Sequence, residues 1–110
     1  MSIRRVPGAC IVGNLVFTSG RTGGEGDTEA QVRNTLKRLE EALKGAGTDL
    51  QHVVKATVYL ADLADRPKYL NPVWEEVFGE NRPARTCVEA KLGPGRAVEI
   101  DLVAVIPDEG

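Results

Sequence analysis

The sequence predicts a single α+β domain in which two helices pack on one face of a mixed β-sheet. Three observations support this fold class. The chain has 110 residues, which suits one hydrophobic core but not two. Two short apolar runs flank a Gly-Asn pair near the N-terminus, as in a β-hairpin. Beyond them, stretches with helical and with strand periodicity alternate, which gives the order β-β-α-β-α-β-β over residues 1–110.

The first two strands are expected at residues 9–11 and 15–18. Gly13 and Asn14 would join them, because both residue types tolerate the positive φ of a tight turn. The glycine-rich segment that follows, residues 19–26, lacks the Gly-Lys-Ser/Thr ending of a phosphate-binding loop. We interpret it as a flexible loop or a lid.

A first helix is predicted to begin at Thr28. Thr28 would be the N-cap and Gln31, three residues later, would complete a capping box. Gly45 and Gly47 would end the helix. Its apolar side chains recur at spacings of four, three and four, and therefore form one stripe: Val32, Leu36, Leu39 and Leu43.

A buried strand over residues 53–60, rich in β-branched side chains, is expected to precede a second helix over residues 67–78. This helix should be uneven, because Pro72 lacks a backbone donor and is tolerated best if Asn71 caps the turn after it. Gly79 would end it. Its apolar side chains are expected to be buried: Val73, Trp74, Val77 and Phe78.

The last two strands are expected at residues 84–90 and 97–106, joined by the Gly-Pro-Gly turn at 93–95. In the final strand, alternation places Leu102 on one face and Val103 on the other, so both faces carry apolar side chains. Two helices can cover only one face of the sheet. We therefore expect the second face to be buried by oligomerisation.

Composition excludes several functional classes. Net charge is −2 and the basic residues are mixed with acidic ones, so no basic stripe for nucleic acid is present. No apolar stretch is long enough to span a membrane, and no apolar segment follows Arg4 and Arg5 as in a signal peptide. We therefore expect a cytoplasmic protein without membrane or nucleic-acid partners. Two cysteines, Cys10 and Cys87, and one histidine are too few for a structural zinc site, and a disulfide is not expected.

Arg85 is the first candidate for chemistry. Alternation along its strand places Arg85, Cys87 and Glu89 on one face, and Thr86 and Val88 on the other. An arginine within a strand is commonly exposed or salt-bridged. The alternative is a carboxylate clamp, because the guanidinium presents a planar fork of donors.

Glu99 and Cys87 each allow two interpretations. Glu99 is either a carboxylate at the rim of the sheet or a group that orients a catalytic water. Cys87 is either a buried thiol or a nucleophile, and the second role needs a base or a cation beside it. The only histidine, His52, is expected in a loop, so a buried thiol is favoured.

Three segments of the chain resemble the RidA/YjgF family, which is also labelled endoribonuclease L-PSP. They are residues 13–20 (GNLVFTSG), 53–62 (VVKATVYLAD) and 82–89 (RPARTCVE), and 98–101 (VEID) follow the last at the family's distance. The block at 82–89 is the most specific of them. The resemblance covers nearly the whole chain, in order.

The resemblance implies a chorismate-mutase-like fold in which three subunits pack their sheets into a barrel, with pockets at the subunit interfaces. It also implies hydrolytic deamination of 2-aminoacrylate, 2-iminobutyrate and related enamines or imines to 2-keto acids and ammonia. No cofactor or metal is implied. The partners would be the small imino acid and two further copies of the chain.

The resemblance also implies roles for individual residues. Arg85 would clamp the substrate carboxylate with help from the backbone of Cys87, and Glu99 would position the attacking water. Asn71 would lie near the pocket, and the backbone of Gly20 would approach the ligand. Thr86 is included among the substrate-binding residues. If Arg85 lies close to Glu99, it would also keep that carboxylate ionised.

The sequence departs from the family pattern near the expected pocket. Val6 stands where the family has an aromatic residue, and Arg21 stands where it has glutamine. The loop before the first helix is also shorter. Val6 would widen one wall of the pocket, and Arg21 would add positive charge at its mouth. A non-catalytic trimer that binds small carboxylates in the same pocket is the alternative function, and a ribonuclease is disfavoured by the charge and the lack of a His/Lys pair.

Overall fold

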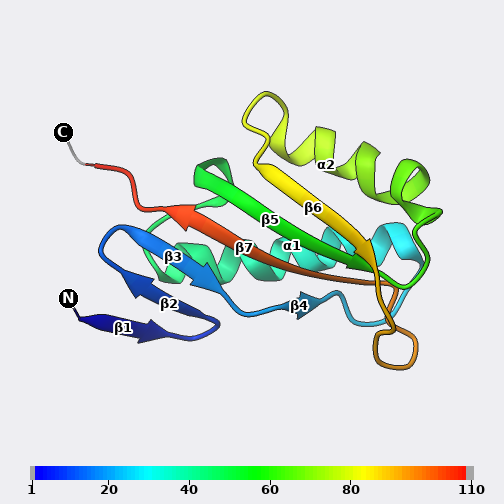
Figure 1. Cartoon of the computed structure of the whole chain (residues 1–110), viewed down its shortest axis with the longest axis horizontal. Helices are drawn as coiled ribbons and strands as arrows, with labels where there is room; N and C mark the ends of the chain where they lie inside the picture. The colour runs from blue at the N-terminus through cyan, green and yellow to red at the C-terminus, as the bar shows by residue number, and fades with distance from the viewer. Residues whose placement is uncertain (1, 109–110) are drawn as a thin grey trace.

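The computed structural model describes residues 2–108 as one α+β domain (Figure 1). The prediction of fold class is confirmed: a seven-stranded mixed sheet carries two α-helices. The elements in chain order are β1 (Ile3–Val6), β2 (Ala9–Val12), β3 (Leu15–Thr18), β4 (Arg21–Thr22), α1 (Thr28–Gly45), β5 (Val53–Leu60), α2 (Asn71–Phe78), β6 (Ala84–Glu89) and β7 (Val98–Val105). A short 3₁₀ turn (Leu50–His52) precedes β5, and a π-helical turn (Arg66–Leu70) precedes α2.

The strand order is β1-β2-β3-β7-β5-β6, and the short β4 also pairs with β7. Only β5 and β6 are parallel, and α2 lies in the crossover between them, as a parallel pair requires. β7 is the central strand, with β3 and β4 on one side and β5 on the other. Strands β6 and β1 therefore lie at opposite edges of the sheet.

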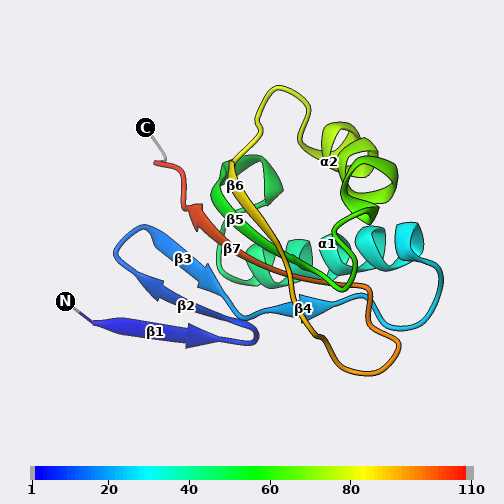
Figure 2. The same ribbon diagram turned by 45° about the vertical axis from the view of Figure 1, so that its right-hand side comes forward.

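The core lies between one face of the sheet and the helices. Alternate side chains of β7 are buried, from Val98 to Ala104, and their neighbours in between are half-exposed. The predicted stripe on α1 is confirmed, since all four of its side chains are buried. In Figures 1 and 2 the helices lie on the same side of the sheet. The other face carries exposed apolar side chains, including Phe17 and Val88.

The start of α1 differs from the prediction. The N-cap is Asp27, whose Oδ1 accepts from the amide of Ala30 at 2.8 Å, and Thr28 is already helical. Gln31 does not close a capping box. Its amide group donates to the carbonyls of Gly26 and Gly95, and its Oε1 accepts from the amide of Ala97. A buried Gln31 thus joins the glycine-rich segment to the start of β7.

The glycine-rich segment, interpreted from the sequence as a flexible loop or a lid, is partly a strand and is hydrogen-bonded to its neighbours. Part of it is the strand β4, which pairs with β7. Arg96 donates to the carbonyl of Gly24 at 3.0 Å, and Asn34 donates to that of Gly23 at 3.3 Å. Together with the bonds of Gln31, these contacts fix the segment to α1 and to the turn before β7.

The second helix is uneven, as predicted, but Asn71 does not cap it. A π-helical turn leads into α2, and Pro72 lies in the first turn of α2, where its missing donor leaves no helical bond unmade. No side-chain cap forms at this end. The side chain of Asn71 is directed to Arg85 instead.

No helix in residues 2–108 combines the length and the apolar character needed to cross a bilayer.

Candidate functional site

Arg85 is held in a fixed position at the edge of the sheet. In the parallel ladder it pairs with Ala56, which is fully buried, so its side chain leaves the sheet on the helix side. Its guanidinium lies over the ring of Trp74, 5.1 Å from the centroid, and Nη2 donates to Oδ1 of Asn71 at 2.9 Å. Cation–π contact and a side-chain hydrogen bond together orient the donor fork.

The surroundings of Arg85 suit an anion. Burial lowers the pKa of Arg85 from its ordinary value, and the nearby positive charge of Arg66 lowers it further, against an opposing effect of Cys87. The guanidinium nonetheless keeps its charge, because an arginine does not deprotonate in proteins. Arg82 and Glu75 form an ion pair at 3.4 Å beside it, and the open pocket they line has a volume of about 300 Å³. An anion bound to Arg85 would offset the repulsion between Arg85 and Arg66.

Cys87 follows two residues later on the same face as Arg85. It pairs with the buried Val58 and is half-buried against the core. Burial raises the pKa of its thiol, against the effects of Arg85 and Arg66, so the thiol stays protonated at neutral pH. This favours the interpretation as a buried thiol over that as a nucleophile.

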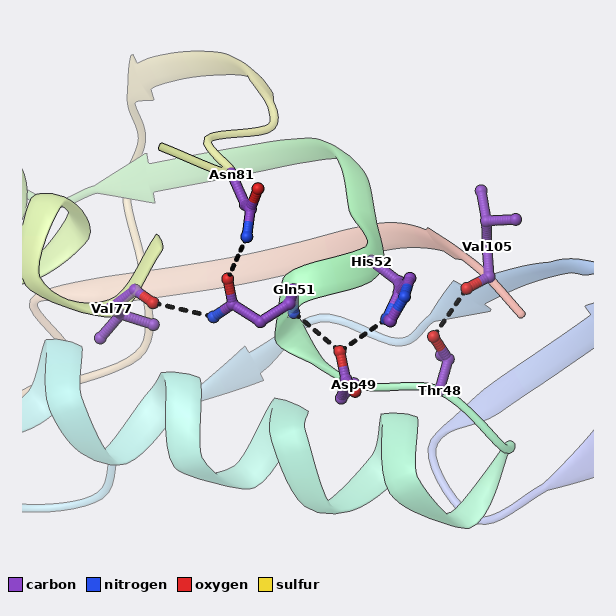
Figure 3. A network of polar contacts seen from close by, with 7 residues as sticks. All are labelled: Thr48, Asp49, Gln51, His52, Val77, Asn81 and Val105. Carbon is purple, nitrogen blue, oxygen red and sulfur yellow. Dashed lines mark hydrogen bonds and ion pairs between the residues drawn. The ribbon is translucent and has the colours of Figure 1, made fainter. Parts of the chain in front are cut away.

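His52 is not a partner for Cys87. Its Nδ1 lies 2.8 Å from Oδ1 of Asp49, which also accepts from the backbone amide of Gln51 at 2.9 Å (Figure 3). His52 ends the turn just before β5, whereas Cys87 is level with Val58. Five residues of strand, roughly 16 Å, therefore separate them.

Glu99 belongs to a second pocket, beside β4. It pairs with Tyr59 of β5 and with Thr22 of β4. A Cβ atom at Gly20 would lie 2.8 Å from Oε2 of Glu99, so the missing side chain at that position leaves room for the carboxylate. The pocket has a volume of about 640 Å³, and its walls include Pro7, Gly20, Arg21, Arg38, Glu41 and Glu99.

The two halves of the predicted site are not neighbours within one chain. Arg85 pairs with Ala56, and Ala56 pairs with Leu102, so Arg85 lies on the buried face of the sheet. Glu99 lies between Val98 and Ile100 in β7, and the side chains of both are buried. Because side chains alternate along a strand, Glu99 leaves the sheet on the opposite face. Arg85 and Glu99 are therefore not brought together within a single chain.

The remaining predicted residues divide between these halves. Asn71 contacts Arg85 directly, and Gly20 lies against Glu99. Thr86 faces away from Arg85, and its hydroxyl accepts from Nζ of Lys55 at 2.6 Å. Val6 packs against the core and, within the single chain, lines a separate pocket with Cys10 and Phe17 rather than the Glu99 pocket.

Sequence reasoning missed the role of Trp74 as the surface on which Arg85 rests. It also missed Arg38 and Glu41, which α1 presents to the Glu99 pocket. The helical spacing of Asn71 and Trp74 places both on one side of α2, a pattern that could have suggested their common partner. Among residues 2–108, no three His, Cys, Asp or Glu side chains are arranged to hold a metal ion.

Comparison with known proteins gives consistent matches over the whole fold. The family model described as endoribonuclease L-PSP matches residues 4–106. A RutC family protein of Pyrococcus abyssi is 38% identical, over 84% of this chain and 80% of its own. The human protein named 2-iminobutanoate/2-iminopropanoate deaminase is 34% identical, over 88% of this chain and 77% of its own. The crystal structure of a YjgF family member from Neisseria meningitidis superposes with a TM-score of 0.90 at 35% identity, covering 98% of each chain.

Proposed function

The chain belongs to the endoribonuclease L-PSP family, which also contains the YjgF and RutC proteins, and on this premise we propose that it hydrolyses 2-imino acids and their enamine tautomers. The observation that supports this best is the orientation of Arg85 by Trp74 and Asn71. A guanidinium fixed in this way binds a carboxylate through two parallel hydrogen bonds. The names of the human and rat relatives, both 2-iminobutanoate/2-iminopropanoate deaminases, point to the same chemistry.

The proposed reaction consumes one water and releases one ammonia. The substrate carboxylate binds to Arg85, and the amide of Cys87 supplies a further donor. Glu99 accepts a hydrogen bond from a water and directs its oxygen toward the carbon of the C=N bond. The new C–O bond forms as the electron pair of C=N moves to nitrogen, which takes a proton. Cleavage of the C–N bond then gives the 2-keto acid and ammonia. No protein nucleophile is needed, because the imine carbon is already electrophilic.

We further propose that one complete site takes Arg85 from one subunit and Glu99 from the next. Their opposite faces and the separation of β6 from β4 support this arrangement. A homotrimer closed through the open sheet face would bury its exposed apolar side chains, among them Phe17, at 43% exposure, and Val88, at 40%. Such head-to-tail contacts close into a ring, with one site at each interface.

The test is keto-acid release in a coupled assay, in which threonine dehydratase generates 2-iminobutanoate. We expect the wild-type protein to accelerate release and the R85A variant to lose the acceleration. The E99Q variant is expected to lose it as well, and E80Q, which removes the same charge at an exposed glutamate, is its matched control. Absence of acceleration by a correctly assembled wild-type protein would overturn the proposal.

The same variants separate the enzyme from a binding protein. Under the proposed mechanism, E99Q should still bind 2-oxobutanoate while turnover falls by about 100-fold, the scale of a lost general base. A binding protein would show wild-type affinity in E99Q and no turnover in either form.

A further inference from the structure

We propose that Tyr59 is a further catalytic residue, whose phenol gives the imine nitrogen its proton while Glu99 takes a proton from the attacking water. The inference rests on the hydrolase function proposed above, and it names the proton donor that this reaction needs. Tyr59 and Glu99 would form the acid–base half of a site that Arg85 of another subunit completes.

A row of paired residues crosses the open face of the sheet at the level of Glu99. Thr22 of β4 and Tyr59 of β5 pair with Glu99 from either side, and Val88 of β6 pairs with Tyr59. Figure 1 shows β6, β5 and β7 side by side. Paired residues of neighbouring strands project from the same face, and in an antiparallel pair their Cβ atoms lie about 5 Å apart. Tyr59 is therefore the direct neighbour of Glu99 on the face where Glu99 acts.

The two side chains leave room for a substrate between them. Oε2 of Glu99 lies beside Gly20, where a Cβ would be 2.8 Å away, so the carboxylate is turned to the β4 side of β7. Tyr59 stands on the β5 side. Side chains stand roughly perpendicular to a sheet, and a tyrosine is the longer of the two, so its hydroxyl rises above the carboxylate. A water on Glu99 and an imine nitrogen next to that water would lie between the two groups.

The hydroxyl of Tyr59 is available to a ligand. The side chain is half-buried, and among residues 2–108 its hydroxyl forms no hydrogen bond. Thr86, diagonally across on β6, already accepts from Nζ of Lys55 at 2.6 Å. The titratable groups that face Tyr59 from β7 are Glu99, directly opposite, and Asp101, on the diagonal.

The reaction requires a proton donor as well as an acceptor. As the C–O bond forms, one proton of the water passes to Glu99, and the electron pair of C=N moves to nitrogen, which takes the proton of Tyr59. The proton on Glu99 then returns the phenolate to its neutral form. The same cycle gives nitrogen its next proton when the C–N bond breaks and the new hydroxyl becomes the keto group. Thr22 also carries a hydroxyl, but a phenol is much the stronger acid.

The experiment measures kcat/KM for 2-iminobutanoate, generated from threonine by threonine dehydratase, through competition with semicarbazide trapping. The variants are Y59F, T22V and Y69F, each of which removes one hydroxyl. Tyr69 lies in the π-helical turn before α2 and is the matched control. Titration with 2-oxobutanoate measures binding, and sedimentation velocity measures assembly. Because the chain has two tyrosines, Y69F expressed with 3-fluorotyrosine carries the label at position 59 alone.

We expect Y59F to lower kcat/KM by about 100-fold, the scale of a lost general acid, with binding and assembly unchanged. Y69F should retain wild-type kcat/KM. Fluorotyrosine at position 59 should move the alkaline limb of the pH profile to lower pH, because fluorine makes the phenol more acidic.

Wild-type kcat/KM in Y59F, or a 100-fold loss in T22V instead, would overturn the role of Tyr59 and leave the hydrolase intact. Loss of 2-oxobutanoate binding or of assembly in Y59F would assign Tyr59 to the structure and also overturn it. If the wild type does not accelerate keto-acid release, the hydrolase proposal fails and the assignment of Tyr59 fails with it.

Discussion

Asp101 is a carboxylate on the open face of the sheet. Its partial burial raises its pKa by more than the neighbouring positive charge lowers it. It pairs with Thr57 in the ladder, and Lys55 lies diagonally from it. The burial of Asp101 raises the pKa of its carboxyl above the ordinary value of 3.8, and the charge of Lys55 opposes this only in part. Nζ of Lys55 donates to Thr86 rather than to Asp101.

The raised pKa of Asp101 has a predictable effect on stability. The folded carboxyl holds its proton to higher pH than the unfolded one, so its contribution is complete below pH 3.8 and is lost as pH rises through the folded pKa. The D101N variant lacks this titration. The unfolding free energy of the wild type, relative to D101N, should therefore fall from pH 4 to neutral pH in urea titrations. A difference that is flat, or that rises with pH, would contradict the assignment.

The residues of the site could be predicted to different extents. Arg85 and Glu99 stand out because charged side chains interrupt apolar strands, and alternation fixes the face each takes within its own strand. Whether side chains of two different strands share a face depends on how the strands pair. The sequence of one strand alone does not determine that pairing. Likewise, the contact of Arg85 with Trp74 joins a strand to a helix, and Trp74 alone is typical of a core residue.

At the scale of elements, β4 and the segment after it are fitted closely to α1. Gly23 is the tightest point, because a Cβ there would overlap the carbonyl oxygen of Gln31 and lie 2.7 Å from its Cα. The obstruction is helix backbone, which cannot turn aside as the end of a side chain can. A glycine is therefore required here by space rather than by φ.

We expect Gly23→Ala to lower the free energy of unfolding by about 1–3 kcal/mol, the range for overpacking a filled site. Chemical denaturation measures it directly. Gly93→Ala is the matched control, because the nearest atom to a Cβ there is 3.8 Å away. Equal stability of the two variants would show that β4 moves away from α1 at little cost.

The elements that sequence patterns predicted either show a clear period or, as with β2 and β3, flank a recognisable turn. The stripe of α1 and the β-branched run of β5 gave correct positions. Strands β1 and β4 were missed, since Arg4 and Arg5 break any apolar alternation in β1 and β4 has only two residues. Asp27 and Thr28 are both good N-caps, and local sequence does not choose between them.

At the scale of the whole molecule, the two faces of the sheet should respond differently to the same substitution. Leu102 is buried at 1% exposure, whereas Val103 is half-exposed and pairs with Phe17 on the open face. A carboxylate at Leu102 would be buried and unpaired, which costs several kcal/mol, on the order of the whole stability of a small domain.

We expect L102D to unfold and V103D to remain folded but fail to assemble. Far-UV circular dichroism reports the fold, and sedimentation velocity reports the assembly. A wild-type protein that sediments as a monomer, or a V103D variant that sediments as the wild type does, would contradict assembly through this face.

Arg85 and Glu99 lie on opposite faces of one sheet, so a loss of either side chain can be tested for complementation by a subunit that retains it. In the proposed ring of three, we expect R85A and E99Q to be inactive alone, whereas every hybrid would contain one interface with both native side chains. Random mixing of the two variants should therefore restore about a quarter of wild-type activity, through intersubunit complementation. A site built within a single chain would show no recovery in the mixture.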